Sequence, residues 1–202
     1  MKVVIESIAT TKLILYSKIA EGEIGGYMDI KIVDGDIIVQ DIILLKQVAS
    51  GASFELDEED GFEFLSKNKK KAARCKGWWH SHVNMAPNWS PQDDETFELM
   101  TNINGFALGI VTNKQKKLNC KVMGRVNGVL IIQDKVDVEV ESSSFFDRIR
   151  LRKKLEKEVE EKVAKETYFN EDENEDEDYL KELKRQTELF DTDDDDKEGE
   201  VV

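Results

Sequence analysis

The chain has 202 residues, of which 40% are hydrophobic, so it is long enough to bury one core. Its net charge of −14 is concentrated at the C-terminus: Asp, Glu, Lys and Arg sum to −3 for residues 1–140, +1 for 141–170 and −12 for 171–202. The near-neutral first part argues against nucleic-acid binding. No uncharged stretch reaches the roughly 18 residues that a membrane span needs. We therefore expect a soluble cytoplasmic protein that binds neither nucleic acid nor a membrane.

The first 45 residues predict a strand, a helix and a hairpin. Residues 3–5 indicate a short strand, and Thr10 or Thr11 is a candidate N-cap for a helix that runs to about residue 20. Residues 27–45 alternate and are rich in Ile and Val, with Asp34-Gly35-Asp36 as a turn between two antiparallel strands.

The middle of the chain continues this alternation of strands and helices. Residues 47–60 are polar and acidic and indicate a loop or an irregular strand. We expect a helix over 61–71, a strand over 72–82, and a helix that Ser90 caps, with Pro91 in its first turn, through about residue 101. Three further strands are predicted at 106–112, 118–126 and 128–140, with Asn127-Gly128 as the turn between the last two.

The predicted organisation is an α/β domain over residues 1–140, a mixed sheet flanked by helices, followed by two charged segments. Residues 141–170 contain a charged amphipathic helix, over about 145–167, that packs on the domain or on a protein partner. Residues 171–202 carry too much like charge to collapse, which favours a disordered acidic tail, although 179–190 has the composition of a short helix. We expect both segments to contribute little to the core.

The most informative residues are the only two histidines, which stand at His80-Ser81-His82. On a strand, residues 80 and 82 face the same way, so both imidazoles can bind one metal ion. Asp93 lies in the first turn of the following helix and can supply a third, anionic ligand. Three protein ligands with one open position are typical of catalytic zinc, whereas Cys75 and Cys120 lack the spacing of a structural zinc site or a disulfide framework.

This pattern resembles the JAMM, or MPN+, metalloprotease family, whose signature is a Glu, then His-x-His, seven residues, Ser, two residues and Asp. The sequence matches this spacing at His80, His82, Ser90 and Asp93, and Gly77-Trp78-Trp79 before the histidines is also similar to the family. The resemblance covers about residues 1–140 and implies a cytidine-deaminase-like fold. One departure is Val83, where many members have Pro.

The resemblance also implies a mechanism and a substrate class. One zinc ion per chain would be held by His80, His82 and Asp93, while a glutamate acts as general base and Ser90 donates a hydrogen bond to the oxyanion. Glu23 fits the glycine-rich context of that glutamate better than Glu21 does. The implied reaction is hydrolysis of peptide or isopeptide bonds, for example in ubiquitin-like conjugates, with residues 47–60 as a candidate flap for an extended substrate.

Two other functions are alternatives to this one. A zinc nucleotide deaminase requires His-x-Glu and a later Cys-x-x-Cys, and the chain has neither. The alternative from a different class is a non-enzymatic MPN-type scaffold, in which the helical extension or the acidic tail binds a protein partner. A scaffold has no need of a general base, so Glu23 favours the enzyme.

Overall fold

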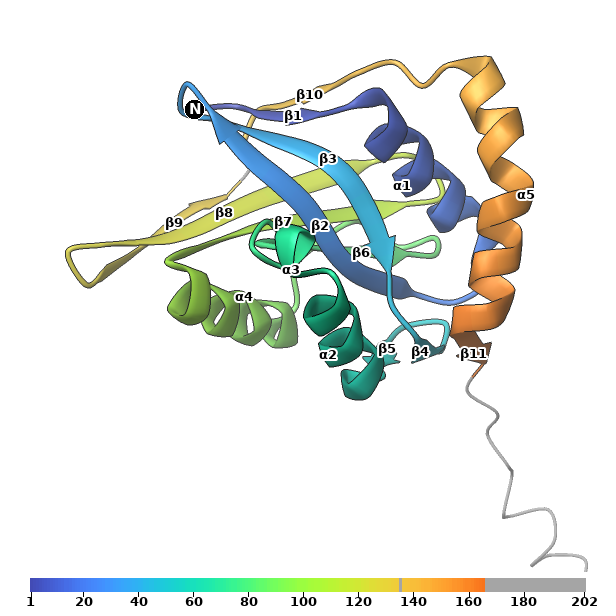
Figure 1. Cartoon of the computed structure of the whole chain (residues 1–202), viewed down its shortest axis with the longest axis horizontal. Coiled ribbons are helices and arrows are strands. Elements are labelled where there is room, and N and C mark those ends of the chain that lie inside the picture. The colour runs from blue at the N-terminus through green and yellow to red at the C-terminus, as the bar shows by residue number, and fades with distance from the viewer. Residues whose placement is uncertain (135, 166–202) are drawn as a thin grey trace, which may run out of the picture. The chain divides into compact units, whose positions relative to one another are not determined.

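The computed structural model describes residues 1–134 and 136–165, which fold as a mixed α/β structure (Figure 1). The predicted acidic tail over 171–202 lies outside the described residues. The helices are α1 (Ser7–Ile19), α2 (Glu58–Lys67), α3 (Lys69–Ala72), α4 (Pro91–Asn104) and α5 (Phe145–Lys162). The strands are β1 (Val3–Ile5), β2 (Ile24–Val33), β3 (Asp36–Leu44), β4 (Gln47–Ala49), β5 (Phe54–Leu56), β6 (Gly77–His82), β7 (Phe106–Asn113), β8 (Leu118–Val126), β9 (Val129–Asp134), β10 (Val138–Val140) and β11 (Val163–Lys165).

The main sheet has eight strands in the order β10-β1-β3-β2-β6-β7-β8-β9. It is mixed, because β1 runs parallel to both β3 and β10 and β6 runs parallel to β7, while the remaining pairs are antiparallel. A second, smaller sheet has the order β11-β4-β5. The mixed sheet flanked by helices agrees with the predicted fold class.

Two adjacent tryptophans on β6 show how the faces of the main sheet are covered. Trp79 is buried and stacks on Tyr16 of α1, with ring centroids 5.6 Å apart. Trp78 belongs to a separate cluster with Phe97 of α4. Because neighbouring side chains on a strand point to opposite faces, α1 and α4 cover opposite faces of the sheet.

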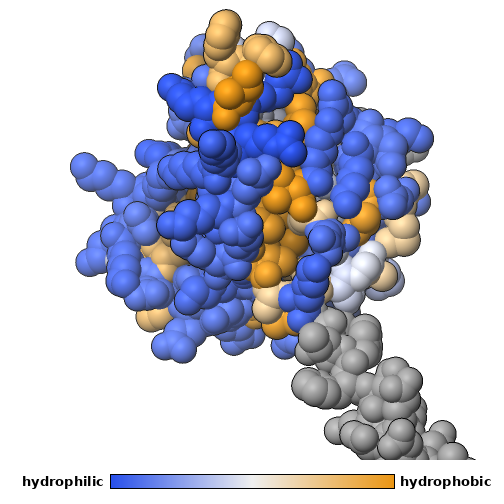
Figure 2. Space-filling view, turned by 90° about the vertical axis from the view of Figure 1, so that its right-hand side faces the viewer, coloured by the Kyte–Doolittle hydropathy of each residue, from blue (hydrophilic) through white to orange (hydrophobic). Residues whose placement is uncertain are grey.

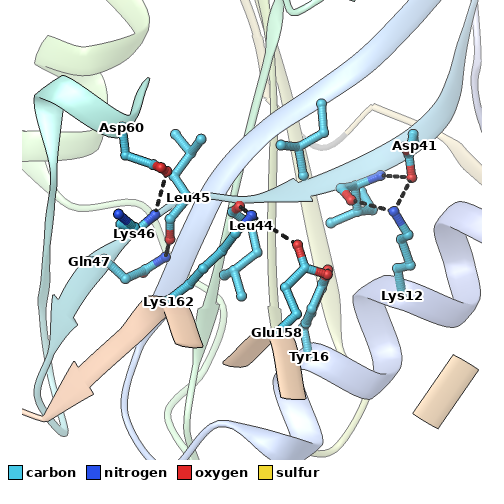
Figure 3. A network of polar contacts seen from close by, with 12 residues as sticks. Lys12, Tyr16, Asp41, Leu44, Leu45, Lys46, Gln47, Asp60, Glu158 and Lys162 are labelled. Atoms are coloured by element: carbon cyan, nitrogen blue, oxygen red, sulfur yellow. Dashed lines mark hydrogen bonds and ion pairs between the residues drawn. The ribbon is translucent and has the colours of Figure 1, made fainter. Parts of the chain in front are cut away.

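Helix α5 packs along α1 and forms part of the core. Leu155 and Val159 are buried in the same cluster as Trp79, so this charged segment contributes more to the core than its composition indicates. Two polar contacts hold α5, one to α1 and one to the end of β3: the Tyr16 hydroxyl donates to Glu158 Oε2 at 2.8 Å, and Lys162 Nζ donates to the Leu44 carbonyl at 2.7 Å (Figure 3). Figure 2 shows the side of the molecule that bears α5; it is mainly hydrophilic, with hydrophobic residues at the top and in a strip down the middle.

Several element boundaries differ from the predicted ones for local reasons. Helix α1 begins at Ser7 rather than beyond Thr10 or Thr11, and neither threonine caps it, since the Thr10 hydroxyl donates to the Ile5 carbonyl and the Thr11 hydroxyl donates to the Ser7 carbonyl. The strand predicted over 72–82 begins only at Gly77, after α3. The predicted strand over 128–140 is two strands, β9 and β10, at opposite edges of the sheet.

Both cysteines are free, buried thiols. Burial raises the pKa of Cys75 and of Cys120 to about 12, so neither is a reactive thiolate near neutral pH. Among the described residues, no helix is both long enough and apolar enough to cross a membrane.

The packing of α5 gives a prediction about stability. Replacing the fully buried Leu155 by Ala should lower the free energy of unfolding by about 2–5 kcal/mol, through lost burial and the cavity that remains. Ile149 on the same helix is 58% exposed, so Ile149→Ala is a matched control with a small expected effect. Urea titrations measure the free energy of unfolding of both variants. Equal losses of this free energy in Leu155→Ala and Ile149→Ala would show that α5 does not pack on the core.

Candidate metal centre

His80 and His82 are brought onto one face of the sheet by β6. This strand pairs with β2, where Gly25 lies opposite His80, and with β7 on its other side. The Nε2 atoms of the two histidines are 3.1 Å apart. Two nitrogen ligands on one tetrahedral zinc ion are about 3.3–3.4 Å apart, so the pair is already close to a chelating distance.

The hydrogen bonds of the histidines show which nitrogens can bind a cation. Nδ1 of His82 lies 2.7 Å from the Ala86 carbonyl, which can only accept, so this nitrogen carries the proton and Nε2 carries the lone pair. His80 is 2% exposed, and within the described part of the chain its Nδ1 has no hydrogen-bond partner. The nearest acidic atom is Asp93 Oδ1, 3.5 Å away from that Nδ1.

The metal-free arrangement of this pair is unfavourable in either tautomer. If His80 carries its proton on Nε2, it can donate to His82, but the lone pair on Nδ1 then faces the Asp93 carboxylate. If the proton is on Nδ1, two lone pairs oppose each other at 3.1 Å. A cation between the Nε2 atoms removes both conflicts, because His80 can then keep its proton on Nδ1, toward Asp93. The donor set therefore fits a metal ion that prefers nitrogen ligands.

Asp93 is held by a capping box at the start of α4. The backbone N–H and the hydroxyl of Ser90 each donate to Asp93 Oδ2 at 2.7 Å, and the Asp93 N–H donates to the Ser90 hydroxyl at 3.2 Å. Ser90 is thus the N-cap and Pro91 is in the first turn, as predicted. The hydroxyl proton of Ser90 points at Asp93 in this structure.

Asp93, the predicted third ligand, is less well placed for one metal ion than the two histidines. The His80 atom nearest to Asp93 is Nδ1, not the Nε2 that faces His82. Accordingly, among residues 1–134 and 136–165 no group of three or more His, Cys, Asp or Glu side chains is gathered as in a loaded metal site. The structure presents two nitrogen donors with a carboxylate beside them.

Glu23 lies next to this group, just before β2. It is 5% exposed, its Oε1 is 4.0 Å from His82 Nε2, and that oxygen has no hydrogen-bond partner in the described residues. Burial raises the pKa of Glu23, the nearby His82 lowers it, and Asp93 raises it further. Glu21, the other candidate, is at the surface, where its carboxylate pairs with Lys165 Nζ at 2.5 Å. The structure therefore places Glu23, and not Glu21, beside the two histidines.

A glutamine and a phenylalanine that the sequence did not single out support this arrangement. Gln47 of β4 is buried and bonds both backbone groups of Gly25, accepting from its N–H and donating to its carbonyl at 2.9 Å each. Phe54 of β5 packs on both Trp78 and His80. A Cβ on residue 25 would lie 2.5 Å from the Phe54 ring and 2.7 Å from the Trp79 carbonyl oxygen, so only glycine fits at this position.

The loop between β6 and α4 is held from the β7–β8 hairpin. Asn113 donates to the Met85 carbonyl at 2.8 Å, and Asn119 donates to the Pro87 carbonyl at 3.1 Å. At Val83, the position where the family often has Pro, the carbonyl accepts from the Lys114 N–H. Polar residues at the ends of a hairpin are the only sequence signal for these contacts, and that signal is weak.

The buried histidine predicts a pH dependence for the metal-free protein. Burial, with a smaller effect of His82, lowers the pKa of His80 to about 4 against the opposing effect of Asp93, whereas an unfolded histidine titrates near 6.5. Below pH 6.5 the unfolded chain binds a proton that the folded chain does not, so stability should fall as the pH falls toward 4. The raised pKa of Glu23 acts in the opposite direction.

Urea titrations at pH 7 and pH 5, in the presence of a chelator, measure this effect. We expect the free energy of unfolding to fall less between pH 7 and pH 5 in His80→Gln than in the parent. An equal loss in both proteins would contradict a neutral, buried His80.

Comparisons with known proteins do not assign the chain to a family. No protein-family model matches it, and no curated protein matches it. Among solved structures, the solution structure of protein DSY2949 from Desulfitobacterium hafniense is similar with a TM-score of 0.49 and 13% sequence identity, over 71% of this chain and 96% of that one. A similarity of this degree gives no information about activity.

Proposed function

We propose that this chain is a zinc-dependent metallopeptidase or isopeptidase of the JAMM, or MPN+, type. The observation that carries the proposal is the meeting of Glu23, His80, His82 and Asp93, which come from three separate segments of the chain, within contacts of 3.1–4.0 Å. Their residue types are those needed for three metal ligands and a general base.

His80, His82 and Asp93 would hold the zinc ion. When bound, zinc supplies Lewis-acid chemistry and lowers the pKa of water to about 7. The Ala86 carbonyl keeps the proton of His82 on Nδ1 and leaves Nε2 for the metal. The hydrogen bonds from Ser90 limit the orientations of the Asp93 carboxylate.

Glu23 would take the proton of the attacking water and return it to the leaving amine. A general base is most effective when its pKa lies near the working pH, and burial shifts the pKa of Glu23 in that direction. Its Oε1 accepts no hydrogen bond from the described residues and so remains available for a water molecule. Ser90 would donate a hydrogen bond to the developing oxyanion after its hydroxyl turns away from Asp93.

The small sheet suggests how an extended substrate would bind. In the described part of the chain, β4 is flanked by β11 and β5, and β5 pairs only with β4. Phe54 at the start of β5 contacts His80, so the open edge of this strand leads to the metal centre. A peptide, such as the C-terminal tail of a ubiquitin-like protein, would add to this edge as a further strand.

The proposal is tested by zinc-dependent hydrolysis. The full chain is incubated with peptide libraries and with isopeptide-linked dimers of ubiquitin-like proteins, before and after removal of metal with a chelator. We expect cleavage that disappears with the chelator and returns with zinc. Cleavage that persists in the chelator, or a zinc-loaded protein that cleaves no substrate of either kind, would contradict the proposal.

A further inference from the structure

Lys121 is a buried cation that the proposed reaction does not use. It lies on β8, is 5% exposed, and faces the side of the sheet that α4 covers. Lysine is rarely buried unless it is paired, because removing an ammonium group from water costs free energy. Lys121 shares its side of the alternating strand with Asn119 and Arg125, so the sequence alone gives no signal that it is buried.

The Lys121 ammonium contacts residues on both sides of the Ser90–Asp93 capping box. It donates to Asp94 Oδ1 at 2.5 Å, one residue after Asp93. It also lies 5.2 Å from the centre of the Trp89 ring, one residue before Ser90, where a cation is attracted to the face of an indole. A second carboxylate, Asp134, is 3.5 Å away.

Trp89 contacts His80 as well as Lys121. Its ring meets His80 edge-on at a centroid distance of 5.8 Å and meets Phe97 at 4.9 Å. The packing against β7 leaves no free space, because a Cβ on Gly109 would lie 1.9 Å from Phe97 and 2.9 Å from Trp89. A shift of Trp89 would therefore disturb His80 or the start of α4.

We infer that Lys121 is a positioning residue for the metal centre: by holding Trp89 and Asp94, it fixes the start of α4 so that Asp93 and His80 can bind zinc together. This inference rests on the proposed function, since it requires that the chain binds zinc. An apolar side chain of similar volume would fill the same space without the cost of burying a charge, but it would lose the ion pair with Asp94 and the cation–π contact with Trp89.

The inference is tested by the zinc affinity of the full chain, measured by competition with a chromophoric chelator. We expect Lys121→Met to weaken zinc binding by about 10–100-fold, the usual effect of losing a residue that orients metal ligands. Lys121→Arg should restore part of the affinity, because a guanidinium can pair with Asp94 and stack on Trp89. The matched control is Lys117→Met, at an exposed position before the same strand, which should leave the affinity unchanged.

The outcomes separate this inference from the proposed function. A folded Lys121→Met variant with the zinc affinity of the parent would overturn the role of Lys121 and leave the proposed function intact, whereas a parent that binds no zinc would overturn both. If Lys121→Met does not fold, the Asp94→Asn variant tests the inference instead. The Asp94 side chain is 55% exposed, and this substitution leaves the buried lysine in place. We expect weaker zinc binding in Asp94→Asn, and parent affinity there would overturn the inference.

Discussion

Glu23→Gln is expected to reduce hydrolysis by about 10²–10⁴-fold, the usual contribution of a general base, while zinc remains bound. The amide keeps the size of the side chain but cannot accept the proton of water at neutral pH. Glu23 is not proposed as a metal ligand; the nearest histidine atom to its carboxylate is 4.0 Å away. The measurement is the cleavage rate of parent and variant at equal zinc content.

Glu21 provides the matched control for this substitution. It lies two residues away, carries the same functional group and pairs with Lys165 at the surface. Glu21→Gln should keep the rate of the parent. If Glu21→Gln is the inactive variant and Glu23→Gln is active, the assignment of the base is wrong.

Ser90→Ala is expected to have two effects of different origin. Loss of the N-cap of α4 should lower the free energy of unfolding by about 1 kcal/mol, because the Asp93 N–H loses its acceptor. Loss of the proposed oxyanion donor should lower the cleavage rate by about 10²–10³-fold. Urea titration and steady-state kinetics on the same variant separate the two effects.

Asp57 allows the capping effect to be measured alone. Its side chain caps α2 by accepting from the Asp60 N–H at 3.0 Å, whereas the hydrogen bonds and ion pairs of the two histidines involve other residues. Asp57→Ala should lose similar stability and retain full activity. If Ser90→Ala retains full activity as well, Ser90 acts only as a cap.

The parts of the structure that were predicted well depend on short-range rules. The Asp34-Gly35 and Asn127-Gly128 turns are recognisable because the chain requires positive φ there, and all four residues have it. His80 and His82 are two residues apart, so their side chains lie on the same face of β6. Ser90 and Asp93 are three residues apart, which is the spacing of a capping box. These local rules bring the two histidines together and place Asp93 at the start of α4.

The parts that were missed depend on contacts between distant residues. The Gln47 side chain makes hydrogen bonds to the backbone of Gly25, which lies 22 residues earlier in the sequence. Lys121 pairs with Asp94, which lies 27 residues earlier. Thr10 matches the local capping rule, yet its hydroxyl bonds to the end of β1 instead. Likewise, residues 138–140 read as a continuation of the preceding strand, but they pair with β1 at the other edge of the sheet.

The most direct test of the metal centre is the zinc content of the purified full chain, measured by elemental analysis beside a His80→Ala/His82→Ala variant. About one zinc ion per chain in the parent and none in the variant is the result we expect, because both Nε2 donors are then lost. A fully folded parent that takes up no zinc when zinc is supplied, or a variant that keeps it, would contradict the assignment of His80 and His82 as metal ligands.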